Sequence, residues 1–464
     1  MDFLVTAGQL ILSLSILIVL HECGHFFPAR FFNTRVEKFY LFFDPWFSLF
    51  KKKVGETEYG IGWLPLGGYV KISGMIDESM DREQMKQEPQ PWEFRSKPAW
   101  QRLIIMLGGV TVNFILGFLI YGMVFWVWGQ EYLPTENAPY GIYADSLGME
   151  LGLEHGDKIL SINEVPFDRF NPGIVIREIV INGADEMKVE RDGQEVAITI
   201  DNDKWTKILS SSTGDKNLFY ARHPTIVNQV VEGKAADLAG IKVGDKLTSV
   251  NGTTAIYFQE FKRELAKYAP AQAMESPSLL ERFFGKEEAP QETVTVDIGV
   301  QRGNDAFELP VELSPNGRIW IAVEMLETET ETFGFGEAMV KGTKEGWNFL
   351  VVQIKAFGKM FSGKINASDS LGGFGSIGSM FGSFWNWQNF WRMTAILSLI
   401  LAFMNLLPIP ALDGGHVMFL LYEIVTGRKP SDRFMEIATM IGFVLLISLV
   451  LYANGLDVFR WLRG

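Results

Sequence analysis

Four long apolar runs stand out from the mixed pattern of apolar and polar positions along this chain. They cover about residues 3–27, 103–128, 390–407 and 437–452. Each approaches the roughly 20 residues that a helix needs to cross the hydrocarbon core of a bilayer. The pattern therefore predicts an α-helical polytopic membrane protein with four transmembrane helices, whose membrane core is formed by residues 1–131 and 390–464.

Between the second and third runs the pattern changes to short alternating strands separated by Gly turns, and it repeats. The segment 152–163, GLEHGDKILSIN, returns as GIKVGDKLTSVN at 240–251. Each copy follows a short helix-like stretch and precedes alternating strands. The arrangement resembles two inserted PDZ domains, which are mixed α/β modules, at 132–220 and 221–314. The second copy holds a Pro-, Glu- and Ala-rich insertion at 270–291, which predicts a loop.

Residues 315–389 connect the repeated region to the third apolar run. Apolar residues such as Phe335 and Trp347 follow helical spacing with Lys and Glu between them, which predicts an amphipathic helix within 333–361. Such a helix could lie along a membrane or pack on the repeated domains, and the periodicity favours packing. The Gly-rich stretch 371–382 predicts a flexible or closely packed turn.

The charge distribution supports this division and limits the partners. The net charge of −13 argues against a nucleic-acid partner, because binding a phosphate backbone needs clustered Lys and Arg. Asp and Glu outnumber Lys and Arg by 38 to 24 in residues 130–390. Lys and Arg occur in the loop after the first span and in the loop between the third and fourth spans. By the positive-inside rule these two loops face the cytoplasm, which places the termini and the repeated domains on the other side of the membrane.

The strongest chemical signal is the sequence His21-Glu22-Cys23-Gly24-His25. Residues four apart share one face of a helix, so both imidazoles can bind one Zn²⁺ while Glu22 lies beside it as a general base. A chance match is the alternative. It is disfavoured because these ionisable residues lie at the end of a membrane span, where they are costly and usually functional.

A catalytic zinc usually has three protein ligands and one open position, so a third ligand is expected. His155 and His223 lie in the repeated domains, on the wrong side of the membrane in this topology. The run NLLPIPALDGGH at 405–416 closes the third span, on the same side as the two motif histidines. Asp413 is the predicted ligand and His416 is the alternative, although an Asp-Gly pair can also simply form a turn.

Together, the HExxH motif on the first span, the NLLPIPALDG run after the third and the tandem PDZ-like modules between them resemble the site-2 protease family. The closest match is its bacterial tandem-PDZ type, which cleaves anti-sigma factors. The resemblance covers nearly the whole chain. It implies that His21, His25 and Asp413 bind Zn²⁺, that Glu22 activates the attacking water, and that Asn405 holds the unwound substrate or polarises its carbonyl.

The resemblance also implies a set of substrate-binding residues. They are Asn405, Pro408, Gly67, Gly68, Tyr69 and Asn113. In the family, the segment corresponding to residues 58–72 is an edge strand that pairs with the substrate, and without the resemblance this segment reads as a plain hairpin. Asn113 belongs to the sequence GGVTVN at 108–113, which departs from the family motif because Gly109 replaces a proline.

These observations predict an intramembrane zinc metalloprotease that hydrolyses peptide bonds within transmembrane segments, in regulated intramembrane proteolysis. The expected substrate is a transmembrane protein, such as a pre-cleaved anti-sigma factor or a signal-peptide-like segment, in contact with the lipid bilayer. The PDZ-like domains would bind peptide C-termini or exclude bulky substrates. One alternative is a non-catalytic membrane PDZ scaffold that binds exported peptides. Another is a membrane-bound zinc protease that acts on soluble peptides.

Overall fold

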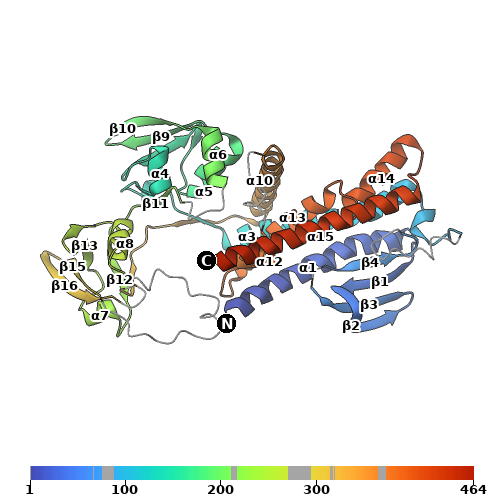
Figure 1. Ribbon diagram of the computed structural model, residues 1–464, viewed down its shortest axis with the longest axis horizontal. Helices are drawn as coiled ribbons and strands as arrows, with labels where there is room; N and C mark the ends of the chain where they lie inside the picture. The colour runs from blue at the N-terminus through green and yellow to red at the C-terminus, as the bar shows by residue number, and fades with distance from the viewer. Residues whose placement is uncertain are drawn as a thin grey trace. The chain divides into compact units, whose positions relative to one another are not determined.

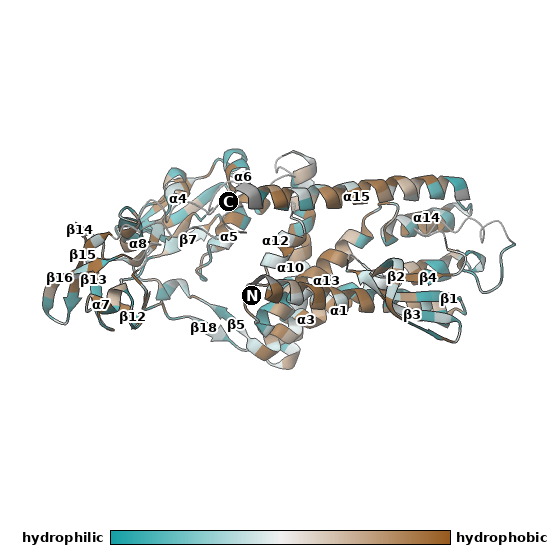
Figure 2. Cartoon of the chain, turned by 60° about the horizontal axis from the view of Figure 1, so that its bottom comes forward, coloured by the Kyte–Doolittle hydropathy of each residue, from teal (hydrophilic) through white to brown (hydrophobic). Residues whose placement is uncertain are grey.

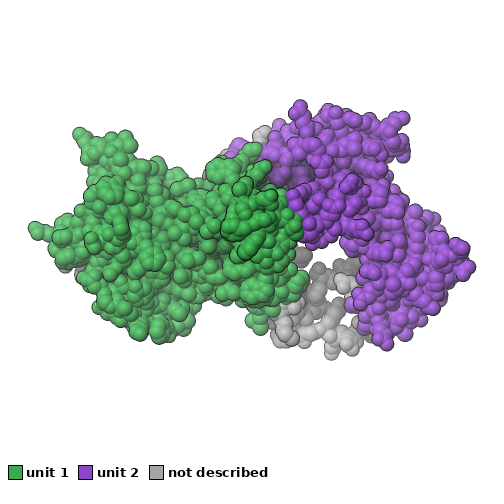
Figure 3. Space-filling model, turned by 180° about the vertical axis from the view of Figure 1, so that it is seen from behind, with its two compact units in different colours: residues 1–130, 332–357, 371–461 green, residues 131–331, 358–370, 462–464 purple. Residues whose placement is uncertain are grey.

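The computed structural model of the chain describes residues 2–65, 67–75, 88–210, 217–269, 294–313, 317, 319–363 and 372–463. The chain divides into two compact units, which are described here one at a time (Figure 3). The first, called the membrane unit, comprises residues 1–130, 332–357 and 371–461. The second, called the repeat unit, comprises residues 131–331, 358–370 and 462–464. The predicted insertion at 270–291 lies outside the described residues.

Four helices of the membrane unit are long and apolar enough to cross a bilayer. They are α1 (Asp2–Phe31), α3 (Ala99–Trp128), α13 (Trp387–Leu406) and α15 (Asp432–Arg463). Apolar residues colour most of their length in Figure 2. The prediction of four membrane helices is confirmed. The fourth span belongs to a helix of 32 residues.

Helix α3 is the centre of this unit, because α1, α13 and α14 (Asp413–Thr426) all pack against it. Small residues let the backbones approach closely, as is common between membrane helices. A Cβ atom on Gly24 of α1 would lie 2.4 Å from the Gly108 carbonyl oxygen of α3. A Cβ on Gly117 would lie 2.6 Å from a methyl carbon of Leu399 on α13. These glycines therefore set the spacing of the helices that carry the candidate site.

A four-stranded sheet follows α1 and packs beside it (Figure 1). Its strands are β1 (Val36–Leu41), β2 (Phe43–Val54), β3 (Thr57–Leu64) and β4 (Tyr69–Ile72). The strand order is β2-β3-β1-β4. Strand β3 pairs in parallel with one side of β1, and β4 pairs antiparallel with the other side. The plain-hairpin interpretation of residues 58–72 is therefore wrong, and β4 is an edge strand.

The repeat unit contains the same arrangement twice. In the first copy one sheet has the order β10-β9-β7-β8 and a second pairs β11 with β6; the second copy has β16-β15-β13-β14 and pairs β17 with β12. The strands of the first copy are β6 (Ile142–Ala144), β7 (Lys158–Ile162), β8 (Val165–Pro166), β9 (Glu186–Arg191), β10 (Gln194–Thr199) and β11 (Phe219–Ala221). Those of the second are β12 (Val227–Val230), β13 (Lys246–Val250), β14 (Thr253–Thr254), β15 (Thr295–Arg302), β16 (Asp305–Glu312) and β17 (Ile321–Val323). The sequence repeat is thus also a repeat of topology.

Short helices precede and follow β7 in the first copy and β13 in the second. The first copy has α4 (Ser146–Leu151), α5 (Pro172–Arg177), the π-helical turn η3 (Glu178–Asn182) and α6 (Asn202–Ser210). The second has α7 (Ala235–Leu238) and α8 (Phe258–Ala266). Each copy has its own core of buried apolar residues. The helix-like stretch predicted before each repeated segment is therefore present in both copies.

The connection to the third span contains two helices. Helix α10 (Phe335–Phe361) confirms the predicted amphipathic helix, and it packs on α3, where a Cβ on Gly342 would lie 2.2 Å from the Gly122 nitrogen. Within the Gly-rich stretch, α12 (Phe374–Ser379) forms a short helix instead of the predicted turn. The first turn of α12 is held by α15, because the Asp457 carboxylate accepts hydrogen bonds from the Ser376 backbone N–H and hydroxyl.

Four further short elements complete the described part of the chain. They are η1 (Phe94–Ser96), β5 (Gln130–Tyr132) with its partner strand β18 (Glu329–Glu331), and the turn η2 (Thr135–Asn137).

Candidate metal centre

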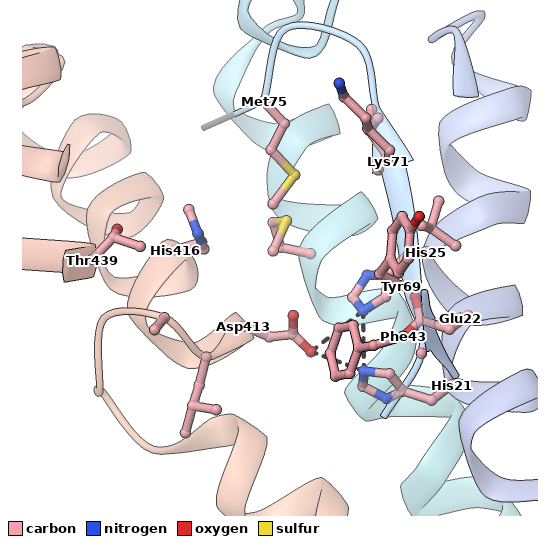
Figure 4. A pocket seen from close by; sticks show the side chains of 16 residues that line it. His21, Glu22, His25, Phe43, Tyr69, Lys71, Met75, Asp413, His416 and Thr439 are labelled. Carbon is pink, nitrogen blue, oxygen red and sulfur yellow. Dashed lines mark hydrogen bonds and ion pairs between the residues drawn. The ribbon is translucent and has the colours of Figure 1, made fainter. Parts of the chain in front are cut away.

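The structure brings together three side chains from the two ends of the sequence. His21 and His25 lie one turn apart on α1, and Asp413 is the first residue of α14 (Figure 4). The Nε2 atoms of the two imidazoles are 3.3 Å apart. Oδ2 of Asp413 lies 3.3 Å from Nε2 of His21 and 3.4 Å from Nε2 of His25. The three atoms form a nearly equilateral triangle.

This triangle fits a tetrahedral Zn²⁺. With metal–ligand bonds of about 2.0–2.1 Å, two ligand atoms of a tetrahedron are separated by about 3.3 Å. The carboxylate Oδ2 of Asp413 is buried and accepts no hydrogen bond from any described residue. A buried oxygen that accepts no hydrogen bond needs another partner, and a cation between the three atoms would provide one. Two imidazole nitrogens and one carboxylate oxygen are also the donor set typical of catalytic zinc.

A carbonyl on α3 orients the His25 ring. Nδ1 of His25 lies 2.8 Å from the carbonyl oxygen of Ile105, which can only accept a hydrogen bond. The proton of the neutral ring must therefore be on Nδ1, which leaves the lone pair of Nε2 free for a metal. Hydrogen bonds of this kind to the second ring nitrogen fix the tautomer of metal-binding histidines.

Two asparagines flank His21 in a similar way. Nδ2 of Asn113 lies 3.2 Å from Nδ1 of His21, and the Oδ1 atom of the same amide is buried without a partner among the described residues. Turning this amide by 180° would let Oδ1 accept the Nδ1 proton of His21 and would leave Nε2 free for a metal. Nδ2 of Asn405, at the end of α13, lies 3.5 Å from Nε2 of His21.

Glycines make room for the cluster. A Cβ on Gly109 would lie 2.4 Å from Nε2 of His25 and 2.6 Å from Cε1 of His21, so a larger residue would push the imidazoles aside. A Cβ on Gly414 would lie 2.2 Å from the Leu407 carbonyl oxygen. The loop before α14 can therefore fold tightly against the helix and present Asp413 at its first turn, where the helix dipole stabilises a negative charge.

A cavity of about 350 Å³ opens beside the three side chains. Glu22, which is 8% exposed, lines it next to the two imidazoles, and the edge strand β4 forms part of its wall. The opposite wall carries His416 of α14 and Thr439 of α15 (Figure 4). Because the Glu22 side chain lines this cavity, it can exchange a proton with a molecule bound there.

Only some of the other predicted site residues line this cavity. Gly68 and Tyr69 line the cavity, whereas Gly67 and Pro408 are not among its lining residues. Pro408 is exposed, and Gly67 faces the ring of Phe43, which would lie 2.8 Å from a Cβ at that position. His416 lines the cavity but is not part of the group of ligand atoms formed by His21, His25 and Asp413.

Several cavity residues were not identified from the sequence. They are Phe43, Val70, Lys71, Ile72, Met75, Met106, Ala411, Leu412 and Thr439. Val70, Lys71 and Ile72 belong to the segment 58–72 that resembles the edge strand of the family. No sequence signal separates the other apolar residues from ordinary core residues. Thr439 is a hydroxyl residue close to the start of the fourth apolar run and has no distinguishing signal of its own.

Comparison with known proteins identifies the family. The family model of peptidase family M50 matches residues 9–449. The chain belongs to peptidase family M50. This confirms the resemblance to the site-2 proteases, and the chain is a metalloprotease of that family.

The M50 peptidase also has full-length relatives. It is 30% identical over 468 residues to a candidate zinc metalloprotease of Neisseria meningitidis, covering 97% of this chain and 98% of that protein. It is 27% identical over 492 residues to the regulator of sigma E protease of Haemophilus influenzae, covering 99% and 100%. It is also 27% identical over 481 residues to protease RseP of Yersinia pestis, covering 97% of each.

Proposed function

We propose that this M50 peptidase is a zinc-dependent intramembrane protease that cuts peptide bonds within transmembrane segments of other membrane proteins. One observation carries the proposal. Two imidazoles from the first span and a carboxylate from the far end of the chain meet at 3.3–3.4 Å, in a unit built from helices long enough to span a membrane. Glu22 lies on the same cavity.

His21, His25 and Asp413 would hold the zinc ion. When bound, Zn²⁺ acts as a Lewis acid that lowers the pKa of water and polarises a carbonyl group. The Glu22 carboxylate takes the proton of the attacking water and passes it to the nitrogen of the leaving amine. The side-chain amide of Asn405, whose Nδ2 atom lies 3.5 Å from Nε2 of His21, would donate a hydrogen bond to the oxygen of the scissile carbonyl.

The edge strand β4 supplies a way to bind the substrate. A transmembrane helix hides its backbone in internal hydrogen bonds, so it must unwind before it can be cut. An unwound segment can pair with a free sheet edge, which again satisfies its backbone groups. Tyr69 is the first residue of β4, Gly68 precedes it, and both line the cavity, which supports strand pairing next to Glu22.

The repeat unit would control which substrates reach the membrane unit. Its two copies, interpreted as PDZ domains, would lie outside the cytoplasm and bind peptide C-termini or exclude bulky substrates. The active site would lie near the cytoplasmic face of the inner membrane. Because a full-length relative is named a regulator of sigma E protease, an anti-sigma factor already shortened by another protease is the proposed substrate.

Glu22→Gln tests the proposal. The purified variant should bind as much zinc as the wild type and should not cleave a transmembrane substrate, whereas wild type should cut that substrate in preference to a soluble peptide of the same sequence. Glu178→Gln is the matched control, because Glu178 is another buried glutamate but lies in the repeat unit. Full cleavage by Glu22→Gln would remove Glu22 from the chemistry, and a wild type that binds exported peptides without cleaving any substrate would favour the non-catalytic scaffold. Equal cleavage of both wild-type substrates would favour a protease of soluble peptides.

A further inference from the structure

Thr439 of α15 carries a buried hydroxyl that has no hydrogen-bond partner in the described part of the chain. Its side chain is only 4% exposed, and Oγ1 makes no hydrogen bond to any described residue. This is unusual for a hydroxyl on a membrane helix, which normally donates to the carbonyl four residues earlier. Thr394 of α13 does so with Phe390, and Ser448 of α15 does so with Val444. A buried polar group left without a partner costs free energy and calls for an explanation.

The position of Thr439 suggests one. Thr439 lines the cavity that also contains Glu22 and β4, on the wall formed by α14 and α15 (Figure 4). Gly442 lies three residues later, on the same face of α15, where a Cβ would be 1.5 Å from the Pro410 carbonyl oxygen. The backbone of α15 is therefore in direct contact with the loop that precedes Asp413. This contact holds Thr439 against the cavity.

A peptide strand in the cavity would need partners on two edges. Successive residues of a strand direct their N–H and C=O groups to opposite sides. Strand β4 can satisfy one edge of an unwound substrate. The other edge would face the wall formed by α14 and α15, in a membrane environment where an unpaired backbone group is expensive. A threonine hydroxyl can donate to a carbonyl or accept from an N–H.

We infer that the Thr439 hydroxyl hydrogen-bonds the backbone of the unwound substrate on the edge away from β4. The inference rests on the proposed function and assigns to the fourth span a substrate-binding residue of this same site. It also accounts for the missing partner, because the hydroxyl is left available for the substrate. The ligand is the peptide backbone, so this contact would not depend on the substrate's side chains.

Thr439→Val tests the inference, since it removes the hydroxyl while keeping the shape of the side chain. The kcat/KM for a transmembrane substrate should fall about tenfold, the effect of one hydrogen bond to a group left unpaired. Zinc content should not change, and resistance to denaturant should stay the same or rise, because an unsatisfied buried group has been removed. Thr439→Ser should retain wild-type kcat/KM. A merely structural hydroxyl would instead lower stability when lost.

Thr394→Val is the matched control. Thr394 is also buried, but its hydroxyl donates to Phe390 and contacts the hydroxyl of Ser13. Its loss should reduce stability and leave kcat/KM of the folded protein unchanged. Binding of an uncut transmembrane substrate to Glu22→Gln, with and without Thr439→Val, gives a readout without turnover, and Kd should rise about tenfold.

Two results would overturn the inference. The first is wild-type kcat/KM and Kd in Thr439→Val. The second is a loss of stability in Thr439→Val that accompanies the loss of activity, as expected for a merely structural hydroxyl. If the wild type cleaves the transmembrane substrate and Glu22→Gln does not, either result refutes the role of Thr439 alone. If the wild type cleaves no transmembrane substrate, the proposed function fails, and the inference fails with it.

Discussion

Buried aspartates in the two units have opposite surroundings. In the repeat unit, Arg191 donates hydrogen bonds to both carboxylate oxygens of Asp157, at 2.8 Å each, and the Glu154 N–H donates another. The second copy repeats this network with Asp245 and Arg302, at 2.6 and 2.7 Å. In the membrane unit, Oδ2 of Asp413 has no hydrogen-bond donor among the described residues and faces two imidazole nitrogens.

This difference separates a structural carboxylate from one that is available to bind a ligand. A bidentate arginine satisfies both the charge and the lone pairs of an aspartate, so the carboxylates of Asp157 and Asp245 need no ligand. Burial opposes ionisation of Asp245, but the hydrogen bonds from Arg302 and from the Lys242 N–H hold the pKa of that carboxyl below its ordinary value. Oδ2 of Asp413 has no comparable donors among the residues that the structure describes, which leaves it available for a cation.

The largest expected effect comes from making the same change in both units. Asp413→Asn should abolish zinc binding and reduce cleavage of a transmembrane substrate by about 10³-fold or more, as expected when a group essential to the chemistry is lost. Asp157→Asn should leave zinc stoichiometry at the wild-type value. Metal analysis of both purified variants, together with a cleavage assay, checks this. Wild-type zinc content in Asp413→Asn would remove Asp413 from the metal site.

A second change tests the other half of the comparison. Asp157→Asn should destabilise the repeat unit by about 2 kcal/mol, since it replaces charge-assisted hydrogen bonds to Arg191 with weaker ones. Hydrogen exchange in peptides from residues 131–331 of the full-length protein measures this locally. Asp192→Asn is the control, because Asp192 is an exposed neighbour and should stay within about 0.5 kcal/mol of wild type. Unchanged protection in Asp157→Asn would show that the arginine network is dispensable.

The elements that the sequence predicted depend on local patterns. The four spans follow from uninterrupted apolar runs, and His21 and His25 follow from helical spacing within five residues. The repeat was visible because its shared residues hold the network in both copies. Asp157 and Asp245 are the aspartates of the repeated Gly-Asp pair, and the Asn163 and Asn251 side chains accept hydrogen bonds from the backbones of the neighbouring strands.

The features that could not be predicted depend on contacts between distant segments. The pairing of β3 and β4 with opposite sides of β1 is long-range, so the hairpin interpretation of residues 58–72 was reasonable and wrong. The partners Arg191 and Arg302 lie 34 and 57 residues after their aspartates, with no signal that links them. Thr439 is indistinguishable in sequence from any hydroxyl residue next to an apolar run. Asp413 could be selected because membrane topology placed it on the same side as the histidines.

The smallest expected effect concerns pH and again distinguishes the two units. His223 of the repeat unit is 5% exposed, and burial lowers its pKa below the ordinary value of 6.5. The unfolded chain therefore binds a proton more readily than the folded one, so stability is fully present above about pH 6.5 and is lost as the pH falls toward the lowered pKa.

Hydrogen exchange in residues 131–331, followed from pH 8 to pH 5, should show declining protection. His223→Gln should flatten part of this decline, and His155→Gln should flatten a further part, because desolvation also lowers the pKa of His155. Neither substitution should change zinc content, because these histidines are not among the proposed zinc ligands His21, His25 and Asp413. An unchanged slope in the double variant would mean that other groups control the acid sensitivity of the repeat unit.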